Sequence, residues 1–271
     1  MTKGIYRALT VAGSDSGGGA GIQADLKTFM AHGVYGCSAI TAVTAQNTLG
    51  VNGVVIISPE MVAAQMDAVL SDIGCDAVKT GMLGNAEVMR AVAESIKSYS
   101  VAKLVVDPVM ISTSGHRLSD QDTADAYINE LFPLALLATP NLFEAEVFYG
   151  QPINTESRLA DAARNILGFG PRWVLIKGGH RNFATGKNMV TDLLTDGISF
   201  VEINNPRLET RCTHGTGCTL SAAITAGLAR GMELPEAVRA AETYLHNAIK
   251  TAVPLGKGHG PVNHGAVGYK L

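Results

Sequence analysis

The chain has 271 residues, of which 46% are hydrophobic and 17% are charged, and this composition excludes an intrinsically disordered protein. The length suits one large hydrophobic core, so we expect a single domain over residues 1–271. The formal net charge is −3, without a run of like charges, so we expect no nucleic-acid partner, no membrane surface and a small molecule as the partner.

Short apolar runs alternate with longer segments of helical period along most of the chain. Strands are predicted at 8–13, 37–45, 76–82, 103–110, 136–141 and 173–179, and helices at 21–33, 58–74, 85–99, 141–150 and 156–170. This alternation favours a mainly parallel sheet with helices on both faces, because parallel neighbours need a crossover helix. The sequence therefore predicts an α/β fold.

Beyond residue 179 the rhythm changes. Two apolar runs, 189–196 and 198–205, are separated by a turn at Asp196 and Gly197, which predicts an antiparallel hairpin at one edge of the sheet. Two further helices are predicted at 214–231 and 235–253. Because no linker or internal repeat interrupts the pattern, one domain remains the expectation.

The four cysteines show neither CxxC spacing nor the density of a secreted disulfide scaffold. We therefore expect reduced thiols. No apolar stretch reaches the ~18 residues that a membrane span requires. These features favour a cytoplasmic protein.

The stretch HGTGCT precedes a long alanine-rich helical pattern. Gly215 and Gly217 permit close approach of a ligand, and the free amides of a helix start favour a phosphate, so one interpretation is an oxyanion hole for phosphoryl transfer. The alternative is a helix simply capped by Thr216 or Thr219. Cys218 is expected to have a lowered pKa and to accept a proton from an alcohol. Packing as a small apolar residue is the alternative for this cysteine.

A glycine-rich stretch, AGSDSGGGAGIQADLKT, follows the first predicted strand. It lacks GxGxxG, because Ile22 interrupts the run that begins at Gly17, and it lacks a GK[ST] ending, so dinucleotide and P-loop chemistry are disfavoured. We expect a flexible cradle leading into a helix, with Asp25 either a favourable first-turn charge or a ligand contact. Gln46 ends the next strand and either reads the edge of a heterocycle or lies in a solvated turn.

Several strand ends carry hard oxygen donors. Asp107 ends a buried strand, where a carboxylate needs a cation or a hydrogen-bond donor. Together with Asn141 and Glu144 it suits Mg²⁺, which is typically held by few carboxylates, water and nucleotide phosphates. Asn141 and Glu144 also match a helix capping box, and both roles can hold together. Lys177, followed by two glycines, is either a phosphate counter-charge or a solvated strand end.

Seven motifs occur in order between about Leu9 and His264, namely AGSDSGGGAGIQADLKT, AITAVTAQNT, VKTGML, DPVM, TPNLFEAE, KGGH and THGTGCTLSAAI. Together they resemble the hydroxymethylpyrimidine/phosphomethylpyrimidine kinases of thiamine biosynthesis, within the ribokinase superfamily. The resemblance implies a ribokinase-like fold, ATP and Mg²⁺ as cofactors, and a homodimer. It also implies two successive phosphorylations of 4-amino-5-hydroxymethyl-2-methylpyrimidine, first to the monophosphate and then to the diphosphate.

The same resemblance implies roles for individual residues. It places five around the pyrimidine, namely Gly13, Asp25, Gln46, Met82 and Val109. It places Asp107 and Glu144 near Mg²⁺, and Asn141, Lys177, Thr191 and Lys257 near the nucleotide. Gly215, Thr216 and Gly217 would form the anion hole, and Cys218 would be the base, where most sugar kinases of the superfamily carry an aspartate.

Two other functions remain open at this point. A pyridoxal/pyridoxine kinase would use the same scaffold, because both substrates carry a hydroxymethyl group on a six-membered nitrogen ring. Gln46 favours the aminopyrimidine, since an amide satisfies a donor and an acceptor together. A non-catalytic vitamin-binding protein is the second alternative, and Asp107, Lys177 and Cys218 argue against it.

Overall fold

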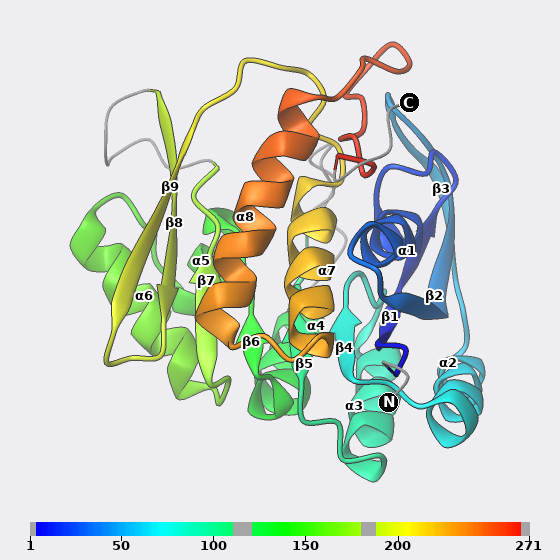
Figure 1. Ribbon diagram of the computed structural model, residues 1–271. Helices are drawn as coiled ribbons and strands as arrows, with labels where there is room; N and C mark the ends of the chain where they lie inside the picture. The colour runs from blue at the N-terminus through cyan, green and yellow to red at the C-terminus, as the bar shows by residue number, and fades with distance from the viewer. Residues whose placement is uncertain (1–3, 111–120, 180–187, 267–271) are drawn as a thin grey trace.

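The computed structural model describes residues 4–110, 121–179 and 188–266 (Figure 1). In this part of the chain a nine-stranded sheet has the order β3-β2-β1-β4-β5-β6-β7-β8-β9. The strands are β1 (Arg7–Asp15), β2 (Tyr35–Asn47), β3 (Gly50–Ile56), β4 (Ala77–Thr80), β5 (Leu104–Val106), β6 (Leu137–Ala138), β7 (Trp173–Ile176), β8 (Met189–Thr195) and β9 (Phe200–Pro206). The strands from β2 to β7 along this order pair in parallel, and antiparallel strands complete both edges.

Helices cover both faces of the sheet, as Figure 1 shows. They are α1 (Gly21–Ala31), α2 (Pro59–Ala68), α3 (Ala86–Ser98), α4 (Gln121–Ala126), α5 (Leu142–Tyr149), α6 (Glu156–Gly168), α7 (Thr216–Ala229) and α8 (Leu234–Lys250), with short helical turns η1 (Val69–Ile73), η2 (Tyr127–Leu131) and η3 (Phe132–Leu134). Helices α1, α7 and α8 share one hydrophobic core, and α2, α3, α5 and α6 share the other. The predicted α/β fold with a mainly parallel sheet is confirmed.

The central strands are apolar on both faces because helices cover both sides. All three residues of β5 and all four of β4 are buried, including the charged side chain of Lys79. Helix α7 is buried from Thr219 to Ala229, and its small side chains allow it to pack closely between α1 and α8. The helix that carries the HGTGCT stretch is therefore fixed in the interior of the protein.

The antiparallel hairpin of β8 and β9 is confirmed, but the opposite edge was not predicted. Strand β3 pairs antiparallel with β2, across a register shift between Ala45 and Gln46. Its side chains are mostly exposed, so it lacks the buried, β-branched signature of the central strands. The helical segment from α4 to η3 was not predicted either. Within the described residues, no helix is long and apolar enough to cross a membrane.

The first turns of α5, α1 and α7 test three predictions about capping and first-turn residues. The Asn141–Glu144 capping box is confirmed, with the Glu144 N–H donating to Asn141 Oδ1 at 3.0 Å and the Asn141 N–H donating to Glu144 Oε2 at 2.7 Å. Asp25 lies beyond the first turn of α1, so its interpretation as a first-turn charge is wrong. The threonine caps are also wrong, because α7 is entered through Gly215 in a left-handed conformation, with φ of 79° and no side-chain cap among the described residues.

Candidate active site

A cavity of about 410 Å³ lies at the carboxyl ends of the central strands, where β2 and β4 flank β1 on opposite sides. This is the position at which open α/β sheets bind ligands. The predicted site residues that line the cavity are Gly13, Gln46, Met82, Asp107, Val109, Asn141, Glu144, Lys177, Gly215, Thr216, Gly217 and Cys218. The fold therefore brings together residues that are up to two hundred positions apart in the sequence.

Three predicted site residues do not line this cavity. Asp25 is fully buried beneath it, where its carboxylate accepts hydrogen bonds from Lys79 and Thr10. Thr191 is on β8, and its hydroxyl donates to Asn204 Oδ1 at 2.6 Å. Lys257 lines a separate hollow formed by residues 209–212 and 254–260. His180, the last residue of the KGGH motif, lies outside the described residues.

A buried ion pair forms one wall of the cavity. Lys177 Nζ donates to Asp107 Oδ1 at 2.7 Å, and Asp107 also accepts hydrogen bonds from Thr139 at 3.2 Å and Ser221 at 3.1 Å. Burial alone would raise the pKa of Asp107, but the charges of Lys177 and Lys79 and the hydrogen bonds to the carboxylate together outweigh it, and the pKa is lowered. The Asp107 carboxylate is therefore charged and held in place by three donors.

Glu144 lies beside this pair but differs from Asp107 in its ionisation. Burial raises the pKa of Glu144 to about 7, with the charge of Lys177 opposing the increase and that of Asp107 adding to it. Near neutral pH this carboxyl group is therefore divided between its two protonation states. An added cation would favour the charged form.

The Gly215–Gly217 loop lies directly against the ion pair. A β-carbon placed on Gly217 would be 3.2 Å from Lys177 Nζ. A β-carbon on Gly215 would be 1.8 Å from the carbonyl oxygen of Gly19, in the glycine-rich stretch. Only glycine fits at this approach of two backbones, and the first-turn amides of α7 have no acceptor within the helix. The loop can therefore offer N–H groups to an anion held by Lys177.

Cys218 is a thiol in this structure. Burial raises its pKa to about 11, even though the charge of Lys79 and a backbone bond from Gly21 act in the opposite direction. The prediction of a lowered pKa is therefore wrong for the described structure, because desolvation of the thiolate outweighs the charge of Lys79 and the hydrogen bond from Gly21. The four cysteines are free, as expected.

Lys79 was missed by sequence reasoning. Its Nζ donates to both oxygens of Asp25 at 2.8 Å, both side chains are fully buried, and Lys79 also lines the cavity. Thr10 adds a 2.6 Å hydrogen bond to the same carboxylate. A lysine within a short strand gives no sequence signal of this kind. Its partner Asp25 lies 54 residues away.

The other end of the cavity is less charged. Gly13 packs so closely on Met82 that a β-carbon on the glycine would be 2.5 Å from the Met82 Cε atom. Val51 of the unpredicted strand β3 pairs with Gln46, and Val54 of the same strand and Phe143 of α5 are further apolar residues of the cavity lining. A flat ring with one polar edge fits this combination of surfaces.

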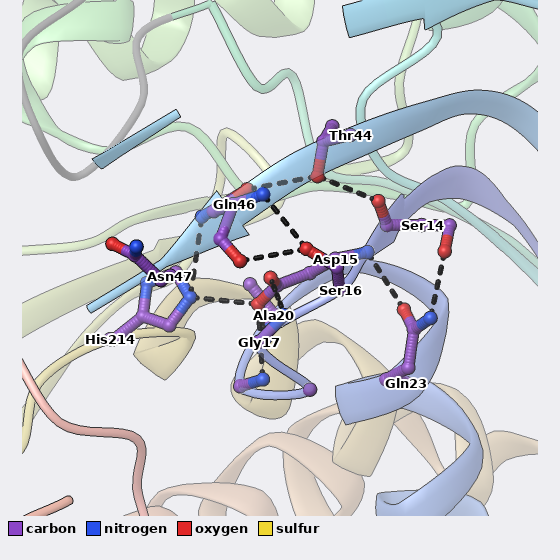
Figure 2. A network of polar contacts seen from close by, with 12 residues as sticks. Ser14, Asp15, Ser16, Gly17, Ala20, Gln23, Thr44, Gln46, Asn47 and His214 are labelled. Carbon is purple, nitrogen blue, oxygen red and sulfur yellow. Dashed lines mark hydrogen bonds and ion pairs between the residues drawn. The ribbon is translucent and has the colours of Figure 1, made fainter. Parts of the chain in front are cut away.

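Figure 2 shows a polar network at this end that was also not predicted. The Asp15 carboxylate accepts N–H bonds from Gly17 at 2.7 Å, Gly19 at 3.0 Å and Ala20 at 2.8 Å, and its Oδ2 lies 2.9 Å from His214 Nε2. The glycine-rich stretch is thus a loop fixed by Asp15 and is not the flexible cradle expected. Asp15 and His214 occur in the quoted motifs, but their pairing across 199 positions leaves no local pattern.

Comparisons with known proteins agree with this geometry. A family model described as phosphomethylpyrimidine kinase matches residues 15–263. The hydroxymethylpyrimidine/phosphomethylpyrimidine kinase of Rhizobium meliloti (strain 1021) is 54% identical over 260 residues, which cover 95% of this chain and 96% of the relative. The solved phosphomethylpyrimidine kinase from Clostridium difficile 630 matches with a TM-score of 0.79 at 43% identity, over 90% of this chain and 99% of that one.

A solved pyridoxal kinase is also similar. The Bacillus subtilis pyridoxal kinase, described in an ADP complex, matches with a TM-score of 0.90 at 38% identity, over 97% of this chain and 99% of that one. The family model and the curated relative nevertheless carry the same kinase description over nearly the full length. The chain belongs to the phosphomethylpyrimidine kinase family.

Proposed function

We propose that the protein transfers the γ-phosphoryl group of ATP to the hydroxymethyl group of 4-amino-5-hydroxymethyl-2-methylpyrimidine, and then phosphorylates the monophosphate to the diphosphate. It does so as one kinase domain over residues 1–271. The observation that carries the proposal is the position of Cys218 and the Gly215–Gly217 loop between the Lys177–Asp107 ion pair and the Gln46 end of one cavity. Relatives with this kinase description support the choice of substrate.

At the pyrimidine end, the ring lies on the apolar surfaces of Met82, Val109 and Val54, with Gly13 allowing close contact. Gln46 pairs with the ring nitrogen and the amino group, because a primary amide offers a donor and an acceptor side by side. The hydroxymethyl group then points along the cavity to Cys218. Asp25 acts on the substrate indirectly, because its carboxylate holds Lys79 in the cavity wall.

At the phosphoryl end, the amides of the Gly215–Thr216–Gly217 loop and the ammonium group of Lys177 neutralise the charge that develops on the transferred group. Asn141 and Thr191 support this end, Thr191 through its carbonyl group, which lies against Gly178 next to Lys177. Contact of Lys257 with the nucleotide is also proposed. Its hollow at residues 209–212 and 254–260 gives room for a group that extends from the phosphates.

Mg²⁺ fits the donor set of Asp107 and Glu144. Among the described residues, no group of three or more His, Cys, Asp or Glu side chains is arranged to hold a metal ion. Two carboxylates are too few for a metal site made of protein ligands alone. They suit Mg²⁺, because this ion usually keeps waters and phosphate oxygens as its other ligands. When bound, it supplies charge neutralisation on the phosphates. With the ion bound, Lys177 must either share the Asp107 carboxylate with Mg²⁺ or turn away from it towards a phosphate oxygen.

In its thiolate form, after its own proton has left to solvent, Cys218 accepts the proton of the hydroxymethyl group as the bond to phosphorus forms. With the charge of Lys79 already acting, the pKa is about 11 and the thiol is not ionised beforehand, so a charge added in the complex, such as that of Mg²⁺, would have to favour the thiolate. In the second step the nucleophile is an already ionised phosphate, and a base matters less. The two phosphorylations therefore place unequal demands on this residue.

The assay follows ATP consumption and the separate appearance of monophosphate and diphosphate, with the pyrimidine alcohol, pyridoxine and pyridoxal as competing substrates. The expected result is a higher kcat/KM for the pyrimidine alcohol, with both products formed. A higher value for pyridoxal would favour the pyridoxal kinase alternative, which the similarity to the solved pyridoxal kinase supports. Binding of the alcohol without turnover would favour a non-catalytic binding protein.

A homodimer in the cytoplasm completes the proposal. Val43 of β2 and Val55 of β3 are paired across the edge hairpin and expose 48% and 67% of their surfaces. A neighbouring group of exposed aliphatic side chains is typical of a surface that a second subunit covers. Sedimentation velocity of the wild type and of Val55→Lys tests this surface, because a dimer that persists unchanged in the variant would exclude it. Cell fractionation tests the location.

A further inference from the structure

The network around Asp15 fixes the direction of one hydrogen bond. Asp15 Oδ2 lies 2.9 Å from His214 Nε2, and both side chains are buried. Burial alone would raise the pKa of Asp15, but the bonds from His214, Gly17 and Ala20 outweigh it and keep the carboxylate charged. A carboxylate can only accept, so His214 Nε2 must carry the hydrogen.

The terminal amide of Gln46 lies between two partners of this network (Figure 2). Its Nε2 is 3.4 Å from His214 Nε2, and its Oε1 is 3.4 Å from Thr44 Oγ1. The Thr44 hydroxyl has one hydrogen, and the nearer acceptor is the carbonyl oxygen of Ser14 at 2.9 Å. Thr44 therefore offers Gln46 a lone pair. His214 Nε2 offers none, because it carries the hydrogen that is donated to Asp15 at 2.9 Å and can be shared with Gln46 only as the longer branch, at 3.4 Å.

These partners match only one orientation of the amide. In the first orientation the Gln46 nitrogen faces His214 Nε2, so that two N–H donors meet. In the same orientation the Gln46 oxygen faces the lone pair of Thr44 Oγ1, so that two acceptors meet. A half-turn about the last side-chain bond exchanges oxygen and nitrogen without moving other atoms. The Thr44 contact then pairs a donor with an acceptor, and at His214 the amide oxygen faces the Nε2 hydrogen, which it shares with Asp15, instead of a second donor facing it. We propose that His214, held by Asp15, is a positioning residue that orients the Gln46 amide with its oxygen towards His214 and its nitrogen towards Thr44, and thereby sets which way round the substrate ring binds.

The consequence for the substrate rests on the proposed function. A 4-aminopyrimidine edge presents a ring nitrogen, which accepts, beside an amino group, which donates. The Gln46 amide pairs with this edge when its N–H faces the ring nitrogen and its oxygen faces the amino group. Reversal of the amide reverses that order, and the ring pairs again only after it has turned over. The hydroxymethyl group, which is next to the amino group on the ring, then moves to the other side of the paired edge. Only one amide orientation therefore directs this group to Cys218.

Which ring nitrogen of His214 carries the hydrogen is tested on the free protein by ¹⁵N NMR of the histidine rings. The His214 signals are assigned from their loss in a His214→Gln variant. The expected neutral form of His214 carries its hydrogen on Nε2. Hydrogen on Nδ1 alone would overturn the inference, because His214 would then accept from the Gln46 nitrogen. This measurement needs no substrate, so it gives a result whether or not the proposed function holds.

The effect on the substrate is tested with two variants of His214. His214→Gln keeps an N–H group near the position of Nε2, whereas His214→Leu removes it, and Thr44→Val removes the lone pair at the other end of the amide. His246→Gln, on α8 and outside the cavity lining, is the matched control. For each protein, kcat/KM is measured for the pyrimidine alcohol and for the analogue without the amino group, with the melting temperature as a check on folding.

The wild type, the control and His214→Gln should prefer the amino compound by at least tenfold, because a site built for a hydrogen bond rejects the analogue that lacks it. His214→Leu and Thr44→Val should lose most of this preference, with a larger loss in kcat than in KM, because the ring binds both ways round. A folded His214→Leu with the wild-type preference would overturn the inference. A wild type that phosphorylates neither compound would refute the proposed function, and the substrate part of this inference with it.

Discussion

Substitution of Gly215 by alanine tests the contact between the anion-hole loop and the glycine-rich loop. At a φ of 79° the new β-carbon costs about 1–2 kcal/mol in backbone strain. It would also lie 1.8 Å from the Gly19 carbonyl oxygen, so the two loops must separate by about 1.6 Å to restore ordinary contact. A shift of about 1 Å at a reacting centre costs roughly 100-fold in rate. We therefore expect kcat/KM to fall at least ~100-fold, or about 2.7 kcal/mol of transition-state stabilisation.

The assay measures initial rates with ATP and the pyrimidine alcohol, together with thermal unfolding by circular dichroism. Gly231→Ala is the matched control, because Gly231 has a φ of 86° and its β-carbon would meet no described atom within 4 Å. It carries the same backbone strain without the clash, so its melting temperature should fall while its activity stays within about twofold of wild type. Equal activities of the two alanine variants would refute the reasoning.

Three further predictions concern buried ionisable groups. Cys218→Ala should lower the rate of the first phosphorylation by ~10²–10⁴-fold and that of the second by less than tenfold, measured with each substrate separately, and equal losses would refute the role as base. Lys79→Met should destabilise the protein by about 3–5 kcal/mol in urea unfolding, because it leaves Asp25 buried without its cation, and adding Asp25→Asn should recover part of the loss. Burial and the neighbouring Asp192 raise the pKa of Glu242 to about 10 from 4.5, so the folded protein retains a proton that the unfolded chain releases. Stability should therefore fall as the pH rises from about 4.5 to about 10, by at most about 1.4 kcal/mol per pH unit, and Glu242→Gln should flatten this dependence; an unchanged slope would contradict it.

The sequence predicts the central sheet because its strands carry strong local signals. Val105 and Val106 lie in an unbroken apolar run, and the helices between strands have clear periodicity and caps, such as Asn141. Strand β3 has no such signal, since Val55 and its neighbours are exposed and the strand joins the sheet by pairing with β2. Its position nevertheless places Val54 in the cavity wall.

Residues at strand ends were predicted to meet because parallel strands point their carboxyl ends to the same edge. That argument places Asp107 and Lys177 together, and their 2.7 Å contact agrees with it. It gives no pKa, because desolvation depends on side chains from all over the fold, and for Cys218 desolvation outweighs the charge of Lys79. The strand-end argument also cannot pair Asp15 with His214, because neither residue stands in a local sequence pattern that points to the other.

The order of strands has a consequence for how the protein matures during synthesis. From β1 onwards, strands β4 to β9 join the sheet at one side in the order in which they leave the ribosome. The sheet can thus grow outwards strand by strand, with each new strand covering the edge left open by the one before. The segment from His214 to Cys218, by contrast, follows the last strand and closes onto a loop that follows the first. A nascent chain without it can complete its sheet but not its cavity, so ligand binding requires this later segment in addition to the complete sheet.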